Sequence, residues 1–190
     1  MTKDLMFRNE IESLVHGAYH ELDVPDGPAT RYYSDDQLAA LPQRARDWAL
    51  GVGNPVPHAD LAEGEVVIDL GCGAGIDVLL AAREVGSTGR VIGLDMLAEM
   101  TERGRAVAEE AGVDNVEFIE GMLDDIPLPD ASVDVVISNG AINLAARKSR
   151  VFAEALRVLK PGGRFCVADI TVDDKDLPPE ILTHPSAWAG

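Results

Sequence analysis

The chain has 190 residues, of which 46% are hydrophobic, and this composition is typical of one globular domain with a sizeable core. Its 33 acidic residues outnumber 16 basic ones, and a net charge of −17 repels nucleic acids and anionic membranes, so neither is an expected partner. Two distant cysteines form neither a disulfide framework nor a metal spacing, and no apolar run approaches a membrane span or a signal peptide, so we expect a cytoplasmic protein without a metal site.

The first 60 residues are predicted to form a helical lid rather than a separate domain. Residues 8–22 have the apolar spacing of an amphipathic helix, and residues 34–50 indicate one or two short helices with Ser34 as the N-cap. Residues 51–60 are rich in Gly and Pro and are expected to form a loop.

From residue 65 onward, strand-like and helical patterns alternate. Short runs rich in Val and Ile predict strands buried on both faces at residues 65–70, 90–95, 115–120, 133–138 and 164–170. Three helices are expected between them. Their predicted inner faces are Ile76, Leu79, Leu80 and Val85, then Leu97, Met100, Val107 and Ala111, then Phe152, Leu156 and Leu159. The expected helix ends are Gly86, Gly112 and the segment Pro161-Gly162-Gly163.

This alternation predicts an α/β fold with a doubly wound, parallel, five-stranded sheet. The expected organisation is a lid at residues 1–60, a core at 61–171 and a tail at 172–190. The crossing over residues 121–132 is either a helix or a loop on this evidence.

A glycine-rich loop, GCGAG at residues 71–75, lies between the first strand and the first helix of the core. A dinucleotide fingerprint has the spacing G-x-G-x-x-G, but here its third position falls on Ile76 and the glycine comes one residue earlier, at Gly75. Asp69 and Asp77 flank the loop with negative charge, which suits a pyrophosphate badly. The loop therefore predicts a cationic or zwitterionic ligand, with an ordinary tight turn as the alternative.

Asp95 ends the second strand, 20 residues after Gly75. At that place a carboxylate can accept hydrogen bonds from both ribose hydroxyls of a nucleoside. Each hydrogen bond to a charged group contributes about 1.5–3 kcal/mol. The alternative is that Asp95 caps the helix that follows. The order of the glycine loop and Asp95 along the chain favours the ligand-binding interpretation.

The glycine loop and Asp95, together with other motifs along the chain, resemble those of the class I S-adenosylmethionine-dependent methyltransferases. The resemblance covers about residues 65–170. The motifs that carry the resemblance are VIDLGCGAG, the strand-ending Asp95, LPDASVDVVISN and LRVLKPGGRF. The resemblance implies a Rossmann-like fold, S-adenosylmethionine as the cofactor and a small-molecule methyl acceptor. The cofactor-binding residues that it implies are Asp69, Gly71, Cys72, Gly73, Gly75, Asp77, Asp95, Met96, Gly121, Met122, Leu123, Ser138 and Asn139.

Each part of this set has a role that the resemblance implies. The glycine loop passes under the methionine part of the cofactor, Asp69 helps to seat its amino group, and Asp95 holds the ribose. Met96 and residues 121–123 enclose the adenine, although an acidic residue is usual where Met122 stands. Residues 138–140, at the end of the fourth strand, face the sulfonium and the acceptor.

A narrower similarity is to the arsenite methyltransferases, carried by residues 49–96, by 126–144 and by THPSAWAG at the end of the chain. Members of that branch bind trivalent arsenic through cysteine thiolates, soft ligands for a soft metalloid. This chain has Val52 and Gly140 at two of the cysteine positions, and it stops at Gly190 before the third. Cys72 and Cys166 are expected to be structural. We therefore expect no arsenic site in the monomer.

Three hypotheses about function stay open on the sequence. The methyl acceptor is either a soft thiol or metalloid, or an apolar organic molecule such as a quinone. Alternatively, the chain is a cofactor-binding or assembly module, or a fragment of a longer enzyme, without activity of its own. The candidate general bases all lie in the lid: His16, His20, Tyr32, Tyr33 and His58. None of them is singled out, so the catalytic residue is left unassigned.

The last predicted strand raises a question of how its edge is covered. Sheets of the family continue beyond the fifth strand with a closing hairpin, and residues 171–190 hold three prolines and no alternating pattern that could supply one. An apolar edge strand is an aggregation hazard. A homodimer through this edge, a tail helix from Pro179, or a bare edge in a truncated chain are the expected alternatives.

Overall fold

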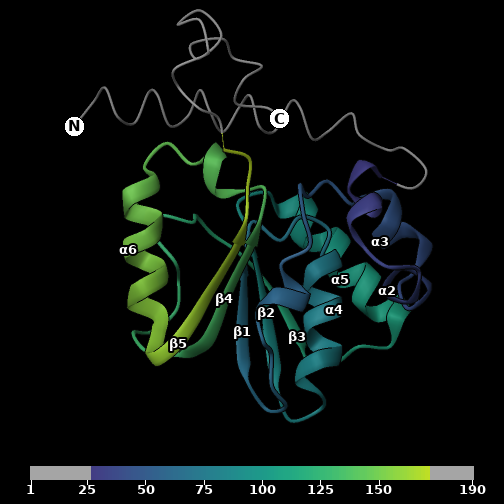
Figure 1. Cartoon of the computed structure of the whole chain (residues 1–190), viewed down its shortest axis with the longest axis horizontal. Coiled ribbons are helices and arrows are strands. Elements are labelled where there is room, and N and C mark those ends of the chain that lie inside the picture. The colour runs from purple at the N-terminus through teal and green to yellow at the C-terminus, as the bar shows by residue number, and fades with distance from the viewer. Residues whose placement is uncertain (1–26, 172–190) are drawn as a thin grey trace, which may run out of the picture.

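The core of the molecule is a five-stranded parallel sheet with helices on both faces (Figure 1). The structure is a computed structural model, and it describes residues 27–171. The strand order is β3-β2-β1-β4-β5. The strands are β1 Val66–Leu70, β2 Arg90–Asp95, β3 Val116–Glu120, β4 Val133–Asn139 and β5 Leu159–Ala168. The predicted doubly wound α/β fold is confirmed, and the first four strands match their predicted bounds to within one residue.

Helices α4 (Ile76–Val85) and α5 (Ala98–Ala111) cover one face of the sheet, and α6 (Lys148–Val158) covers the other. Gly86 and Gly112 follow α4 and α5 with φ of 65° and 64°, as predicted for helix ends. The crossing between β3 and β4, residues 121–132, is a loop, which settles the alternative left open by the sequence. Within residues 27–171, no helix is both long and apolar enough to cross a membrane.

Alternate strand residues face two separate hydrophobic cores. In β1, Val67 belongs to the core on the α4 and α5 side, whereas Ile68 and Leu70 belong to the core on the α6 side. Val67 lies opposite Val91 of β2 and Val135 of β4, so β1 is paired on both edges. Because β2 and β3 extend to one side of β1 while β4 and β5 extend to the other, the strand order reverses at β1 and β4. A crevice forms at the carboxyl ends of strands at such a point.

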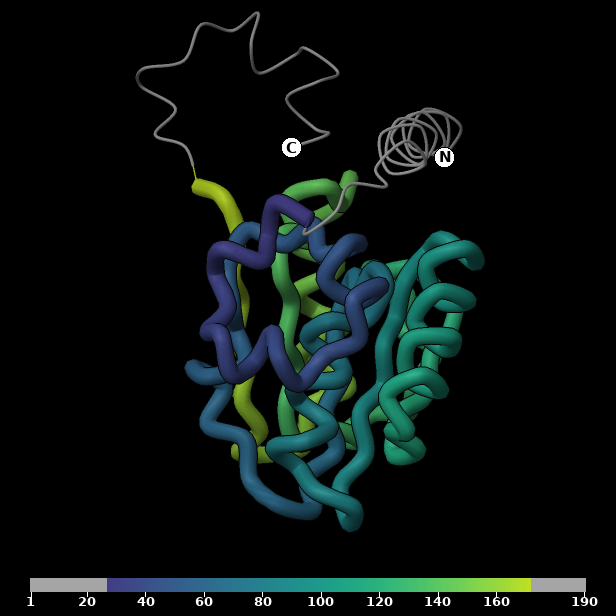
Figure 2. The backbone as a smooth tube through the Cα atoms, turned by 90° about the vertical axis from the view of Figure 1, so that its right-hand side faces the viewer, coloured from purple at the N-terminus to yellow at the C-terminus, as the bar shows by residue number. Residues whose placement is uncertain are grey.

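Residues 27–60, the described part of the predicted lid, pack on the α4 side of the sheet, and we call them the lid segment. It contains four short helices: η1 Pro28–Tyr32, α2 Asp35–Ala39, α3 Gln43–Asp47 and η2 Val56–His58. Ser34 caps α2 as predicted, and the Gln37 side-chain oxygen accepts a hydrogen bond from the Ser34 amide in a capping box. The buried apolar residues here join the core around α4, and Figure 2 shows the purple and blue segment lying over that layer. The helix predicted at residues 8–22 lies outside the described residues, and the domain boundaries stay predictions.

The predicted inner face of the third helix is wrong. Phe152 and Leu156 are 44% and 67% exposed, and Leu159 is not helical but begins β5. The apolar residues that α6 buries are Val151, Ala155 and Val158. Both sets repeat at helical spacing, and the larger side chains happen to lie on the outer one. The buried stripe is also interrupted by Glu154, which stays buried because Arg157 pairs with it at 2.7 Å.

The prediction that Pro161-Gly162-Gly163 ends the third helix is wrong. This segment lies inside β5. The strand pairs with β4 first at Leu159 and again from Arg164, and the register shifts between these two points. This irregularity takes up the extra residues of β5, and Gly162 adopts a φ of 84° within it. As a result β5 begins five residues earlier than predicted and ends at Ala168, before Ile170.

Candidate functional site

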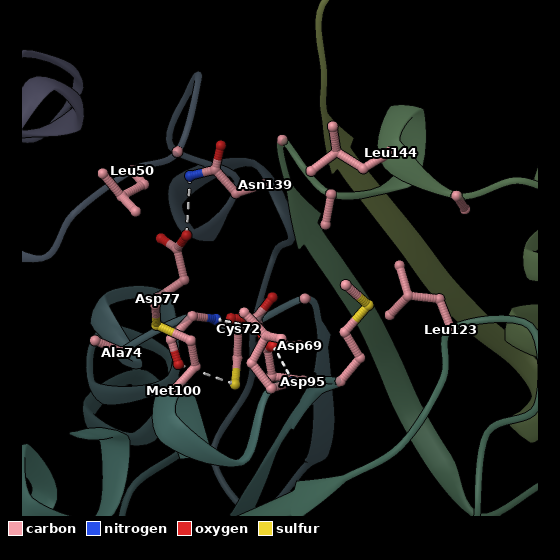
Figure 3. A pocket seen from close by; sticks show the side chains of 18 of the residues that line it. Leu50, Asp69, Cys72, Ala74, Asp77, Asp95, Met100, Leu123, Asn139 and Leu144 are labelled. Carbon is pink, nitrogen blue, oxygen red and sulfur yellow. Dashed lines mark hydrogen bonds between the residues drawn. The ribbon is translucent and has the colours of Figure 1, made fainter. Parts of the chain in front are cut away.

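A cavity opens at the carboxyl ends of β1, β2 and β4, where the strand order reverses (Figure 3). Its walls come from the loops after β1 and β3, from the ends of β2 and β4, and from the lid segment. Ten of the thirteen predicted cofactor residues line it: Asp69, Gly71, Cys72, Gly73, Asp77, Asp95, Met96, Met122, Leu123 and Asn139. The structure therefore brings most of the predicted set to one place.

The glycine loop between β1 and α4 depends on backbone conformations that favour glycine. Gly71, Gly73 and Gly75 have φ of 75°, 51° and 88°, all in the left-handed region. A Cβ atom on Gly75 would lie 2.8 Å from the ring of Phe118, so this glycine allows close packing of the helix start. A Cβ on Gly73 would meet nothing within 4 Å, and Gly73 lines the cavity. The loop thus leaves open backbone beside the space where a ligand fits.

Three buried carboxylates meet at this loop, as Figure 3 shows. Asp69 is 1% exposed, and its Oδ1 atom has no hydrogen-bond partner within the described protein. Burial raises the pKa of Asp69 well above its usual value, and repulsion from Asp77 and Asp95 raises it further. Burial also raises the pKa of Asp77, to about 6. Among the described residues, no Lys, Arg or His side chain lines the cavity to offset this charge.

Asp95 holds the turns on both sides of it. Its Oδ2 accepts a hydrogen bond from the Gly73 amide at 2.9 Å, and its Oδ1 accepts one from the Leu97 amide at 3.0 Å. Burial raises the pKa of this carboxyl group, and these backbone donors oppose the shift. The helix-capping alternative is wrong, because the N-cap of α5 is Leu97 and no side chain caps that helix, whereas Asp95 accepts from amides that precede the helix. Each carboxylate oxygen has a further lone pair, so the group can still accept hydrogen bonds from a ligand in the cavity.

Asn139, the last residue of β4, joins the sheet to the lid segment. Its Oδ1 accepts hydrogen bonds from the amides of Val52 at 2.8 Å and Gly53 at 3.0 Å. Its Nδ2 lies 2.9 Å from Asp77 Oδ2 and 3.1 Å from the Tyr33 hydroxyl. The Tyr33 hydroxyl donates to Asp77 Oδ1 at 2.9 Å. One side-chain network thus links β4, α4 and the lid segment at the edge of the cavity.

The other side of the cavity is apolar. In Figure 3, Leu123 from the loop after β3 and Leu144 from η3 (Ile142–Leu144) lie away from the carboxylates. Residues 140–141 and 145–146 add backbone and small side chains to this side. The buried Asp124 carboxylate also lines the cavity, and it is paired with Arg147, whose Nη2 atom lies 2.7 Å away.

Three predicted cofactor residues do not line the cavity. Gly75 is the last residue of the loop and the N-cap of α4, and the Gly121 amide donates to the Asp95 carbonyl. Ser138 is fully buried between strands, where its Oγ donates to the Leu70 carbonyl at 2.8 Å. Their positions indicate packing and turn roles rather than contact with a ligand.

The candidate bases have no support as bases from their positions. Burial and the adjacent Asp77 raise the pKa of Tyr33, so its hydroxyl stays protonated. Tyr32 and His58 are exposed and are not among the residues that line the cavity. His16 and His20 lie outside the described residues.

Sequence reasoning missed three residues of the lid segment that line the cavity, Trp48, Leu50 and Gly51. A signal was present, because GVGNP at residues 51–55 is a second glycine-rich loop. Its composition predicts a connecting loop and does not by itself indicate that the loop lines a cavity. A Cβ atom on Gly51 would lie 2.3 Å from the Asn139 amide, so the glycine is needed for the lid segment to approach β4.

The two positions where the resemblance places arsenic-binding cysteines are neighbours in the structure. A Cβ atom on Gly140 would lie 3.4 Å from the γ carbons of Val52. Cys72 belongs to the glycine loop and is buried, and burial raises the pKa of its thiol. The Cys166 sulfur lies against the Pro55 carbonyl. Within residues 27–171, no group of three or more His, Cys, Asp or Glu side chains is arranged to hold a metal ion.

Comparisons with known proteins agree with this architecture. A family model described as a methyltransferase domain matches residues 61–189. An arsenite methyltransferase from Halobacterium salinarum is 46% identical over 158 residues, which make up 83% of this chain and 40% of the relative. A demethylmenaquinone methyltransferase from Listeria welshimeri is 36% identical over 107 residues, covering 56% of this chain and 45% of the relative.

Among solved structures, an arsenic(III) S-adenosylmethionine methyltransferase from Chlamydomonas reinhardtii is similar, with a TM-score of 0.72 and 39% identity. The match covers 84% of this chain and 54% of that one. The chain spans less than half the length of the curated relatives named above.

Proposed function

This chain belongs to the class I S-adenosylmethionine-dependent methyltransferases, with arsenite methyltransferase-like sequence, and we propose that it binds S-adenosylmethionine in the cavity beside β1 and methylates a small apolar molecule there. The observation that carries the proposal is the group of three buried carboxylates on a glycine loop, without a cationic side chain among the described residues lining the cavity. The alternative of a binding or assembly module is not favoured by this family.

The residues present fit the proposed cofactor. S-adenosylmethionine carries two positive charges, an ammonium and a sulfonium, and its methyl group is electrophilic. The free Oδ1 of Asp69 is a buried acceptor that a cation would satisfy. Asp95 would hold the ribose hydroxyls, and Met96, Met122 and Leu123 would pack against the adenine. A dinucleotide would place phosphates beside the same carboxylates, which is electrostatically unfavourable.

The chain contributes to methyl transfer mainly by position. The cavity walls hold the reactants near each other, which removes much of the entropic part of the barrier. The apolar side chains on the Leu123 and Leu144 side exclude water from the acceptor. The carboxylate on the apolar side of the cavity, Asp124, is paired with Arg147. Among the described residues, no free general base therefore lines that side. This arrangement suits an acceptor that needs no strong base.

We propose that the acceptor is an apolar organic molecule rather than a metalloid. The apolar wall supports this choice, and so does the pair Val52 and Gly140, which puts aliphatic and backbone atoms where soft thiolate ligands would be needed. One relative in the comparison is a demethylmenaquinone methyltransferase, so an isoprenoid hydroquinone is a suitable first substrate to test.

Calorimetry with S-adenosylmethionine tests the cofactor proposal. We expect binding by the wild type, at least 10-fold weaker binding by Asp95→Ala, and unchanged binding by Asp114→Ala, an exposed control. Equal binding by all three proteins, or stronger binding of NAD, would contradict the proposal. Transfer from radiolabelled cofactor tests the acceptor, with arsenite plus thiol and demethylmenaquinol compared in parallel. Turnover of arsenite alone would contradict the acceptor class.

We also propose that the outer edge of the sheet pairs with a second copy of the chain. Among the residues that the structure describes, β5 has a strand neighbour on one side only. Four of the five large apolar side chains exposed in residues 27–171 lie on or just after α6 and β5: Phe152, Leu156, Val167 and Ile170. Unpaired backbone beside exposed apolar side chains favours association, and a two-fold dimer is the commonest form.

A further inference from the structure

We propose that Tyr33 is a positioning residue of the cofactor site, which holds Asp77 ready for a cationic group and fastens the lid segment over the cavity when that group is bound. The inference rests on the proposed function. It assigns a role to a residue that does not touch the ligand, and it makes binding of the cofactor and closure of the lid segment one coupled event.

The contacts of Asp77 lead to this assignment. Asp77 is the second residue of α4, immediately after the glycine loop, and is 3% exposed while lining the cavity. Its two oxygens accept from two different parts of the chain, Oδ1 from the Tyr33 hydroxyl and Oδ2 from Asn139 Nδ2, both at 2.9 Å. The orientation of this carboxylate is therefore set by the lid segment on one side and by β4 on the other.

Tyr33 is suited to this role because it is buried within the lid segment. It is 6% exposed and packs in the same core as α4. Its hydroxyl has one hydrogen, which it donates to Asp77, and it accepts from Asn139. Asn139 in turn accepts from the Val52 and Gly53 amides. Loss of the Tyr33 hydroxyl would weaken the connection of residues 28–53 to the sheet as well as the support of Asp77.

Charge explains why a ligand would tighten the network. The titratable groups that face Asp77 are Asp69 on β1 and Tyr33 on the lid segment, and neither provides a positive charge. Hydrogen bonds to an ionised carboxylate are stronger than those to a neutral one. A cation in the cavity favours ionised Asp77, and ionised Asp77 binds the Tyr33 hydroxyl more strongly. Because such coupling is reciprocal, docking of the lid segment must favour the cation equally.

The test compares Tyr33→Phe with Tyr32→Phe, a matched control at a neighbouring exposed tyrosine that does not line the cavity. Binding of S-adenosylmethionine is measured by calorimetry from pH 5.5 to 8.5. Burial raises the pKa of Asp77 to about 6, and the hydrogen bond from Tyr33 opposes this shift. Without that bond Asp77 is protonated over a wider range. We expect Tyr33→Phe to lose about 10-fold in affinity at pH 6 and clearly less at pH 8, and Tyr32→Phe to match the wild type.

Two further measurements separate positioning from packing. Amide exchange of Val52 and Gly53 should slow on adding S-adenosylmethionine to the wild type, and should slow much less in Tyr33→Phe. In an Asp77→Asn background, Tyr33→Phe should change affinity by the same factor at every pH. If Tyr33→Phe does not fold, Asp77→Asn is compared with the wild type instead, and it should reduce the pH dependence of binding near pH 6, with Asp69 and Asp95 responsible for what is left.

The outcomes distinguish this inference from the proposed function. A wild type that does not bind S-adenosylmethionine overturns both. A wild type that binds, together with an affinity loss in Tyr33→Phe that is equal at all pH values, overturns the positioning role alone. A pH dependence near pH 6 that is as large in Asp77→Asn as in the wild type also overturns it.

Discussion

Replacing Asp77 by Asn should stabilise the ligand-free protein at neutral pH. Asp77 is buried, and the only groups that hydrogen-bond to its oxygens in the described structure are the neutral side chains of Tyr33 and Asn139. An Asn side chain has nearly the same shape, can accept from Asn139 and can donate to the Tyr33 oxygen. The substitution therefore removes a buried charge with little change in packing.

The size of the effect follows from the pKa. The folded-state pKa of about 6 lies above the usual value of about 3.9, so the folded state binds this proton more tightly than the unfolded state. The associated stability is fully present below pH 4 and is lost as the pH rises through 6. The difference corresponds to about 3 kcal/mol in total, of which about 2 kcal/mol is lost between pH 4.5 and 7.5.

Urea unfolding of the wild type and Asp77→Asn at pH 4.5 and pH 7.5 measures this difference. We expect the variant to gain about 2 kcal/mol relative to the wild type between the two pH values. Asp114→Asn, at an exposed position, should show no comparable gain. If the difference in unfolding free energy between Asp77→Asn and the wild type were the same at both pH values, the charge argument would be refuted.

Three other predictions concern the loop, the thiol positions and the sheet edge. Gly75→Ala should lower the free energy of unfolding by about 2–3 kcal/mol, because Gly75 has a φ of 88° and an added Cβ would lie 2.8 Å from the Phe118 ring. Gly112→Ala should lower it by about 1 kcal/mol, because Gly112 has a φ of 64° but open space around it. Thermal unfolding of the two variants measures the difference. The double variant Val52→Cys, Gly140→Cys should gain arsenite binding that Val52→Cys alone lacks, measured as arsenic retained after desalting, and equal retention would contradict the adjacency argument. Leu156→Glu should shift the protein towards monomer in sedimentation at micromolar concentration, and a wild type that is already monomeric would exclude the proposed dimer.

The fold could be predicted because local pattern and global topology agree in this chain. Buried parallel strands give continuous runs of Val and Ile, and the glycines after α4 and α5 mark helix ends without ambiguity. The pattern was misleading where two signals competed. In α6 the larger apolar residues lie outside, and in β5 a Pro-Gly-Gly segment that commonly ends helices is absorbed by an irregularity of the strand. The packing of α6 on the sheet decides the first case, and the pairing of β5 with β4 decides the second.

The site could be predicted as far as the loops at the strand ends, because parallel strands deliver their carboxyl ends to one edge of the sheet. The contribution of the lid segment could not be predicted in the same way. Tyr33 reaches Asp77 across 44 positions of sequence, and the Gly- and Pro-rich loop at residues 51–60 between the lid helices and β1 has no periodic signal that fixes its path. The sequence shows a glycine at position 51, but it does not show why a side chain is excluded there. The cause is the side-chain amide of Asn139, in a strand 88 residues later.

The carboxylates of Asp69, Asp77 and Asp95 favour binding of a cation at the expense of stability. Burial raises the pKa of each despite the hydrogen bonds that Asp77 and Asp95 accept, so each destabilises the ligand-free fold near neutral pH. Removing the charge of Asp77 relieves that cost and at the same time removes the attraction for a cation. A gain in stability from Asp77→Asn that accompanies a loss of affinity for S-adenosylmethionine is therefore one effect measured twice. A purely structural carboxylate would show the first change without the second, so the pair of measurements identifies which of these residues serve the ligand.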